Sequence, residues 1–186
     1  MEIGATKAVQ DRLKTTKIEE SKGASLVFCW DTHLTKIKGR NVLFIVNASN
    51  RYTIAMTDIE PRNWNYYTMY IRSVIHGVMQ EMGYSEDQIG QYFKMSGDTT
   101  VTKTHGRKSV GGINRMVMDA QYFGKKLEKE AKYQWELSEY LNRDICQPEG
   151  FDAYGYPSEL FKLDMERLGI AAKRKPVKII DFTRYI

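Results

Sequence analysis

The chain has 186 residues, of which 42% are hydrophobic and 27% are charged, and its formal net charge is +5. This balance is typical of a folded soluble protein and excludes disordered and collagen-like classes. A chain of this length buries enough surface to fold without disulfides or a metal. The two cysteines, Cys29 and Cys146, lie far apart without CxxC spacing, which favours free thiols in a reducing compartment.

Membrane insertion and secretion are not expected. The longest strongly apolar run, residues 42–46, is much shorter than the roughly 20 residues that a bilayer span needs. Glu2 and Asp11 interrupt the amino-terminal region, and no apolar stretch typical of a signal peptide follows them. We therefore expect a cytoplasmic protein with no membrane partner.

The charge is distributed unevenly along the chain. Residues 1–98 are nearly neutral, whereas residues 99–133 carry eight basic and three acidic side chains. Residues 134–172 reverse this balance with three basic and eight acidic side chains, and residues 173–186 carry five basic and one acidic. Such blocks either neutralise one another across the fold or face a charged partner, and a basic block suits the phosphates of nucleic acid.

The amino-terminal third predicts a sheet. After a helix over residues 6–17, four short runs rich in β-branched and aromatic residues are separated by turn-forming residues. The predicted strands are Leu26–Trp30, His33–Ile37, Asn41–Asn47 and Arg51–Thr57. Their short connections predict an antiparallel meander, and an exposed edge of this sheet could pair two copies of the chain as a homodimer.

The next part of the chain predicts helices. Pro61 opens an amphipathic helix that ends at Gly83, and Ser85 begins a capping box for a second helix that ends at Gly97. Further helices are expected from Ser109 to Phe123, over Tyr133–Ile145 and over Ser158–Leu168, with β-prone runs at Thr99–Thr104 and Val177–Ile180.

The predicted fold class is therefore α+β, with an N-terminal antiparallel β-meander and several helices packed on one face of it. A single domain is expected over residues 1–172, β-rich over 24–60 and helical over 61–172. The basic C-terminal segment, residues 173–186, is expected to form a strand.

The most unusual segment is Thr102–Arg115, a glycine-containing turn with four cations and no acidic residue. Backbone N–H groups at a helix that begins at Ser109, with Lys and Arg nearby, favour an anion. The spacing does not match a P-loop or a dinucleotide fingerprint. The turn is either a solvated connection or a contact with phosphates or an acidic partner. The candidate contact residues are Lys103, His105, Arg107, Lys108, Arg115, Lys125 and Lys126.

Enzyme chemistry has little support in the sequence. His105 beside Arg107 permits a metal-independent ribonuclease in which the histidine is the general base, but no second catalytic acid is identifiable. Cys29 and His33 lack the further ligands that a zinc site needs. We therefore expect a non-enzymatic protein with no catalytic residue, metal or cofactor, and keep a ribonuclease or toxin-like enzyme as the alternative.

Several positions together resemble an uncharacterised domain family of bacterial plasmids, phages and other mobile elements. The resemblance covers roughly residues 24–125 and is weaker around Tyr156–Leu168. It depends on Trp30 after an apolar strand, then Val46-Asn47 and Asn50-Arg51-Tyr52, and on the pattern Thr104-x-x-Arg107-x-Ser109-Val110-x-x-x-Asn114. The family implies no activity for any residue.

This resemblance implies a phage or plasmid accessory factor in the bacterial cytosol. One such class is the anti-CRISPR proteins, and we expect an inhibitor of the type II effector nuclease with its guide RNA. Acidic residues 134–172 could mimic DNA in the nuclease channel, or basic residues 99–133 could hold DNA or RNA directly. A general nucleic-acid-binding accessory protein is the main alternative.

Overall fold

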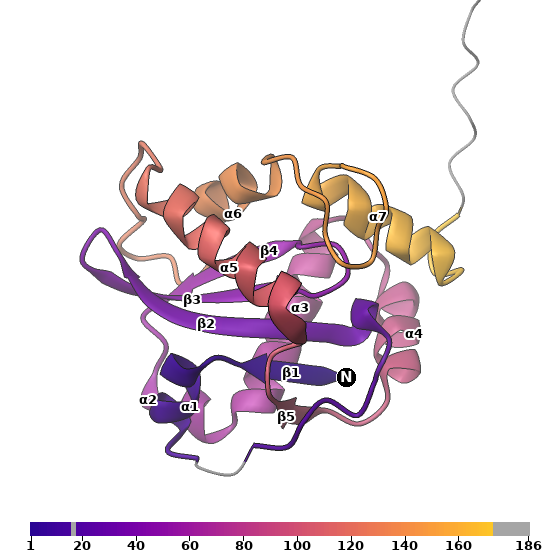
Figure 1. The fold of residues 1–186 in the computed structure, drawn as a ribbon, viewed down its shortest axis with the longest axis horizontal. Helices are drawn as coiled ribbons and strands as arrows, with labels where there is room; N and C mark the ends of the chain where they lie inside the picture. The colour runs from indigo at the N-terminus through magenta and orange to yellow at the C-terminus, as the bar shows by residue number, and fades with distance from the viewer. Residues whose placement is uncertain (16–17, 173–186) are drawn as a thin grey trace, which may run out of the picture.

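Five strands form one mixed sheet, in the order β4-β3-β2-β1-β5, within a computed structural model that describes residues 1–15 and 18–172 (Figure 1). The strands are β1 (Glu2–Ala5), β2 (Cys29–Ile37), β3 (Arg40–Asn47), β4 (Thr53–Thr57) and β5 (Thr100–Thr102). The strand expected at Val177–Ile180, with the whole segment 173–186, lies outside the described residues.

The antiparallel meander is confirmed for β2, β3 and β4. The prediction of two separate strands, Leu26–Trp30 and His33–Ile37, is wrong. Strand β2 is continuous over Cys29–Ile37, and Leu26–Phe28 forms a short 3-10 helix, η1. Strand β1 was not predicted from the sequence. It pairs in parallel with both β2 and β5, so it occupies an interior position of the sheet. This pairing brings Glu2 beside Cys29 in register.

The helices largely follow the sequence pattern. They are α1 (Lys7–Leu13), α2 (Pro61–Asn65), α3 (Tyr67–Glu81), α4 (Glu86–Ser96), α5 (Gly106–Gln121), α6 (Trp135–Asn142) and α7 (Pro157–Arg167). The capping box at Ser85 is confirmed, because its side chain accepts from the Gln88 N–H and the Gln88 side chain accepts in return. The helix that Pro61 opens is interrupted at Tyr66.

The prediction that helices cover only one face of the sheet is wrong. Strand β3 alternates its side chains between two cores, and both are covered by helices (Figure 1). Leu43 and Ile45 pack with residues of α3, α4 and α7, whereas Phe44 packs with residues of α5 and α6. This double burial explains the continuous apolar run in β3, which has no polar face. Helix α5 and helix α4 therefore lie on opposite faces.

Both edges of the sheet are covered within the described part of the chain. The N–H groups of Ala55 and Thr57 on β4 donate to the Ser138 hydroxyl and to the Lys132 carbonyl. At the other edge, Thr102 on β5 forms a parallel bridge with Glu19. The exposed edge on which the homodimer was predicted is thus occupied, and the homodimer stays a prediction. Among the described helices, none combines the length and apolar character that crossing a membrane requires.

Candidate functional site

The turn between β5 and α5 separates one buried side chain from several exposed ones. Helix α5 begins at Gly106, three residues before the expected start at Ser109. Gly106 has φ of 92°, a left-handed conformation that favours glycine. His105 immediately before it is directed into the protein, whereas Arg107 and Lys108 immediately after it are exposed.

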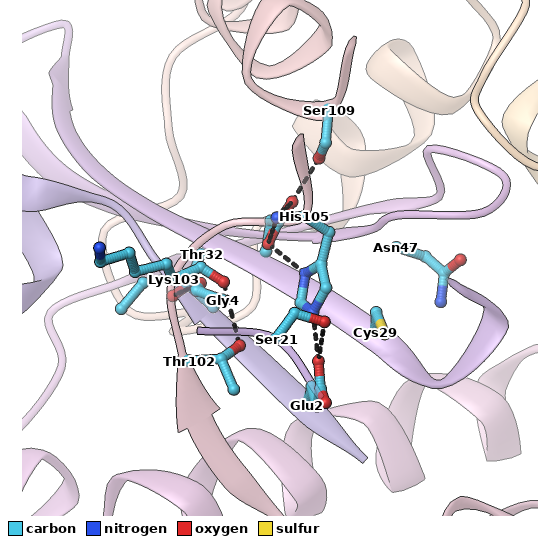
Figure 2. Close-up of polar contacts among 12 residues, drawn as sticks. Glu2, Gly4, Ser21, Cys29, Thr32, Asn47, Thr102, Lys103, His105 and Ser109 are labelled. Atoms are coloured by element: carbon cyan, nitrogen blue, oxygen red, sulfur yellow. Dashed lines mark hydrogen bonds and ion pairs between the residues drawn. The ribbon is translucent and has the colours of Figure 1, made fainter. Parts of the chain in front are cut away.

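His105 is not a surface contact, which corrects its place among the predicted contact residues. Its side chain is only 3% exposed. Nδ1 lies 2.7 Å from Oδ1 of Asp31 on β2, and Nε2 lies 3.0 Å from Oε2 of Glu2 on β1. Figure 2 shows the ring pointing toward Glu2. Because both ring nitrogens are bonded to carboxylates, His105 in this position offers neither nitrogen to an external substrate.

The ring is held by a polar network that we call the histidine cluster: Glu2, Asp31, His105 and Ser109. The Ser109 hydroxyl donates to Asp31, so it does not cap α5 as predicted. The backbone N–H of His105 also donates to Asp31, at 3.2 Å. Asp31 therefore fixes the start of α5 against the sheet through three donors from one turn of chain.

Hydrogen bonds stabilise the charged forms of His105 and Glu2 in the histidine cluster. Burial alone lowers the pKa of a histidine, but hydrogen bonds to Asp31 and Cys29 raise the pKa of His105 to about 10. Burial also raises the pKa of a carboxyl, but donors from Ser21, the Lys22 N–H and His105 leave the pKa of Glu2 below its ordinary value. At neutral pH, His105 is therefore an imidazolium beside the carboxylate of Glu2.

The exposed cations around the turn are only partly paired. Lys103 pairs with Glu20, and Nε of Arg115 lies 3.2 Å from Asp119 on the same helix. Exposed pairs of this kind are worth about 0–1 kcal/mol, so they leave the cations available to other anions. Arg107 and Lys108 form no ion pair or hydrogen bond with any described residue.

A pocket of about 350 Å³ lies beside the first turns of α5. We call it the cationic cleft. Its lining residues are Ala48, Arg51, Lys108, Ser109, Gly111, Gly112, Arg115, Gln147, Pro148 and Glu149. Three of these are cations and one, Glu149, is an anion, so the lining has a net positive charge.

Arg51 is the cleft residue that the sequence analysis did not select. Its guanidinium donates to the Gly112 carbonyl at 2.9 Å, although the two residues are 61 positions apart. A Cβ on Gly112 would lie 3.1 Å from Nε of Arg51, so the glycine allows this close approach. The only signal in the sequence was the Asn50-Arg51-Tyr52 run, which had no assigned role.

Lys125 and Lys126 do not join the cationic cleft. They follow the end of α5, a helix of 16 residues and therefore about 24 Å long, whereas Lys108 lies at its start. Lys125 pairs with Glu136 at 2.6 Å beside a second pocket, of about 440 Å³, which is lined partly by Trp135 and Tyr140. The predicted contact residues therefore divide between two separate places.

Ion pairs neutralise part of the acidic block. Within residues 134–172, Glu139 pairs with Arg143 and Asp164 lies 3.3 Å from Arg167. The Lys125–Glu136 pair links the basic block with the acidic block. Local pairing of this kind gives no support to the hypothesis that the acidic block mimics DNA.

One of three comparisons with known proteins found a match, and it covers most of the described residues. A family model, described as a domain of unknown function (DUF6933), matches residues 2–160. This range includes the histidine cluster and every residue that lines the cationic cleft. Neither the search of curated proteins nor the search of solved structures found a match.

Proposed function

We propose that this chain, which belongs to the DUF6933 family, binds the phosphate backbone of nucleic acid through the cationic cleft and the first turn of α5. The observation that carries the proposal is the placement of Arg107 and Lys108. Both are exposed at the start of a helix, and neither is bonded to any other described residue. The positive end of the helix dipole adds to their charge.

The cleft supplies the geometry that surface lysines alone lack. Arg51 is partly buried, and its bonds to the Gly112 carbonyl and to Cys146 use only part of the five N–H donors of its guanidinium. Arginine donors in a fixed fork match phosphate oxygens, whereas Lys108 adds a point charge. Glu149 on the rim opposes an anion, so we place the phosphate on the side formed by Arg51, Lys108 and Arg115.

Recognition on this basis does not depend on base sequence. The cleft presents cations and glycine backbone, which are suited to phosphates, and phosphate contacts position a nucleic acid without reading its bases. The narrower hypothesis, an inhibitor of the type II CRISPR nuclease, stays a prediction. For that function, the bound nucleic acid must also belong to the complex of the nuclease with its guide RNA.

Fluorescence anisotropy with short labelled RNA and DNA at low salt tests the proposal. Because electrostatic contacts dominate binding of this kind, the double variant Arg107→Glu/Lys108→Glu is expected to weaken binding on the order of 10- to 100-fold. The two side chains have no described partner, so the variant should keep the wild-type melting temperature. Binding that is unchanged in the variant would contradict the proposal.

A matched control is Lys36→Glu/Lys94→Glu, which changes the net charge by the same amount. Both lysines are exposed. Lys36 lies near the opposite end of α5, where its carbonyl accepts from Gln121, and Lys94 is on α4, across the sheet from the cleft. The control is expected to bind nearly as well as wild type. Equal loss in both variants would indicate attraction by net charge alone and would remove the cleft from the proposal.

A further inference from the structure

Three metal-ligating side chains meet in the interior of the fold. One ligand atom each from Glu2, Cys29 and His105 lies within 4.8 Å of the other two. All three residues are buried. They come from β1, β2 and the start of α5, and the parallel pairing of Glu2 with Cys29 brings the first two together. In the sequence, Cys29 is close only to His33, and the other two ligands are distant along the chain.

We propose that Glu2, Cys29 and His105 bind a zinc ion, with water as the fourth ligand. Carboxylate oxygen, thiolate sulfur and imidazole nitrogen form a mixed donor set that suits zinc in tetrahedral geometry. Three protein ligands and one open position are typical of zinc sites that keep a bound water.

The geometry needs only a small change to accept the ion. Zinc bonds of about 2.0–2.3 Å at tetrahedral angles place the ligand atoms about 3.3–3.7 Å apart. Nε2 of His105 and Oε2 of Glu2 are 3.0 Å apart, so this pair opens slightly. The three atoms otherwise converge by at most about 1.5 Å from their present separations.

The groups around the three ligands orient them as in known zinc sites. Asp31 lies 2.7 Å from Nδ1 of His105, which leaves Nε2 directed toward Glu2. A carboxylate in this position fixes the ring and increases the basicity of a metal-bound histidine. Glu2 is held in turn by the Ser21 hydroxyl at 2.6 Å and by the Lys22 N–H at 2.8 Å.

Cys29 makes only weak hydrogen bonds to the backbone. Its Sγ lies 3.5 Å from the Ser25 carbonyl and 3.7 Å from the Ala24 carbonyl, and a thiol is a weak donor. Its side chain also bonds to His105, the neighbouring ligand. Figure 2 shows Cys29 beside the Nε2 end of the His105 ring, near Ser21 and Glu2. Ser21 and Lys22, which contact Glu2, are exposed, so this side of the site lies next to solvent.

Zinc binding is coupled to the release of protons. The ion binds neutral imidazole nitrogen and thiolate sulfur, so any proton on Nε2 of His105 or on Sγ of Cys29 leaves to solvent.

Cobalt and zinc alone, added to the full chain after dialysis against a chelator, test the proposal. Cobalt is expected to bind at one equivalent with the d–d spectrum of a tetrahedral site and a thiolate-to-cobalt charge-transfer band. Zinc is expected to displace it. Cys29→Ser should abolish the charge-transfer band, whereas the control Cys146→Ser, which changes the other buried thiol, should keep it. A band that survives in Cys29→Ser, or no stoichiometric binding by wild type, would overturn the proposal.

Two further measurements keep the test decisive if Cys29→Ser does not fold. Zinc is expected to slow alkylation of Cys29 in the wild-type protein, as mapped by mass spectrometry, and to leave Cys146 unaffected. Asp31→Asn, which changes a positioning residue, is expected to lower zinc affinity about 10- to 100-fold. Equal protection of both thiols, or none, would mean that the cluster is an acid–base network without a metal.

Discussion

Asp31 and His105 are 74 positions apart in the sequence and 2.7 Å apart in the fold. Both side chains are almost completely buried, and this contact ties the start of α5 to the middle of the sheet. The cations that follow His105 are therefore presented from a fixed turn. Rigid presentation reduces the ordering that binding requires.

Replacing His105 should destabilise the fold strongly. His105→Gln leaves Asp31 and Glu2 without their shared cation, and removal of one partner from a buried ion pair costs about 3–5 kcal/mol. The measurement is the free energy of unfolding in urea, with a chelator present. His76→Gln is the control, because His76 pairs with Glu86 at the surface and its loss should change stability by less than about 0.5 kcal/mol. Similar values for the two variants would show that the histidine cluster contributes little.

The approach of β1 to Asp31 depends on Gly4. A Cβ built on Gly4 would collide with Oδ1 of Asp31. Since the neighbouring backbone of Thr104 is also close, Gly4→Ala is expected to destabilise the protein by about 1–3 kcal/mol, as overpacking does.

Gly90→Ala on α4 is the opposite case, because a Cβ there meets nothing within 4 Å. It should stabilise the helix by about 0.5–1 kcal/mol. Urea midpoints that do not differ between the two variants would contradict this packing.

The pH dependence of stability should carry a contribution from His33 on β2. Burial lowers the pKa of His33 below its ordinary value of 6.5. Below about pH 6.5 the unfolded chain therefore binds a proton that the folded chain does not, and stability falls as the pH falls through this window. His33→Gln removes this term, so its stability curve should be flatter than that of wild type as the pH falls below about 6.5. His76→Gln, which changes a half-buried histidine paired with Glu86, serves as the reference. A His33→Gln curve parallel to wild type would contradict the prediction.

Local signals in the sequence predicted most of the elements. The Ser85–Gln88 capping box, the helix that Pro61 opens and the meander from β2 to β4 all depend on residues within a few positions of one another. Such signals act before the tertiary fold forms, so periodicity and turn chemistry reveal them.

The contacts that define the site could not be predicted from local sequence patterns. Strand β1 has only four residues, all of them buried, and its pairing with β2 and β5 joins distant segments. The basic character of residues 102–115 made His105 look like a surface residue, whereas its two carboxylate partners lie far away in the sequence. For the same reason Ser109 resembled a helix cap, although its hydroxyl donates to Asp31.

The salt dependence of nucleic-acid binding tests the central claim most directly. If the four cations Arg51, Arg107, Lys108 and Arg115 each neutralise a phosphate, the slope of log K against log salt for duplex DNA should be about −3.6. In Arg107→Glu/Lys108→Glu the slope should become shallower by about 2, one for each lost contact. We expect this change together with an unaltered slope in Lys36→Glu/Lys94→Glu. A wild-type slope near zero, or the same slope in all three proteins, would contradict it.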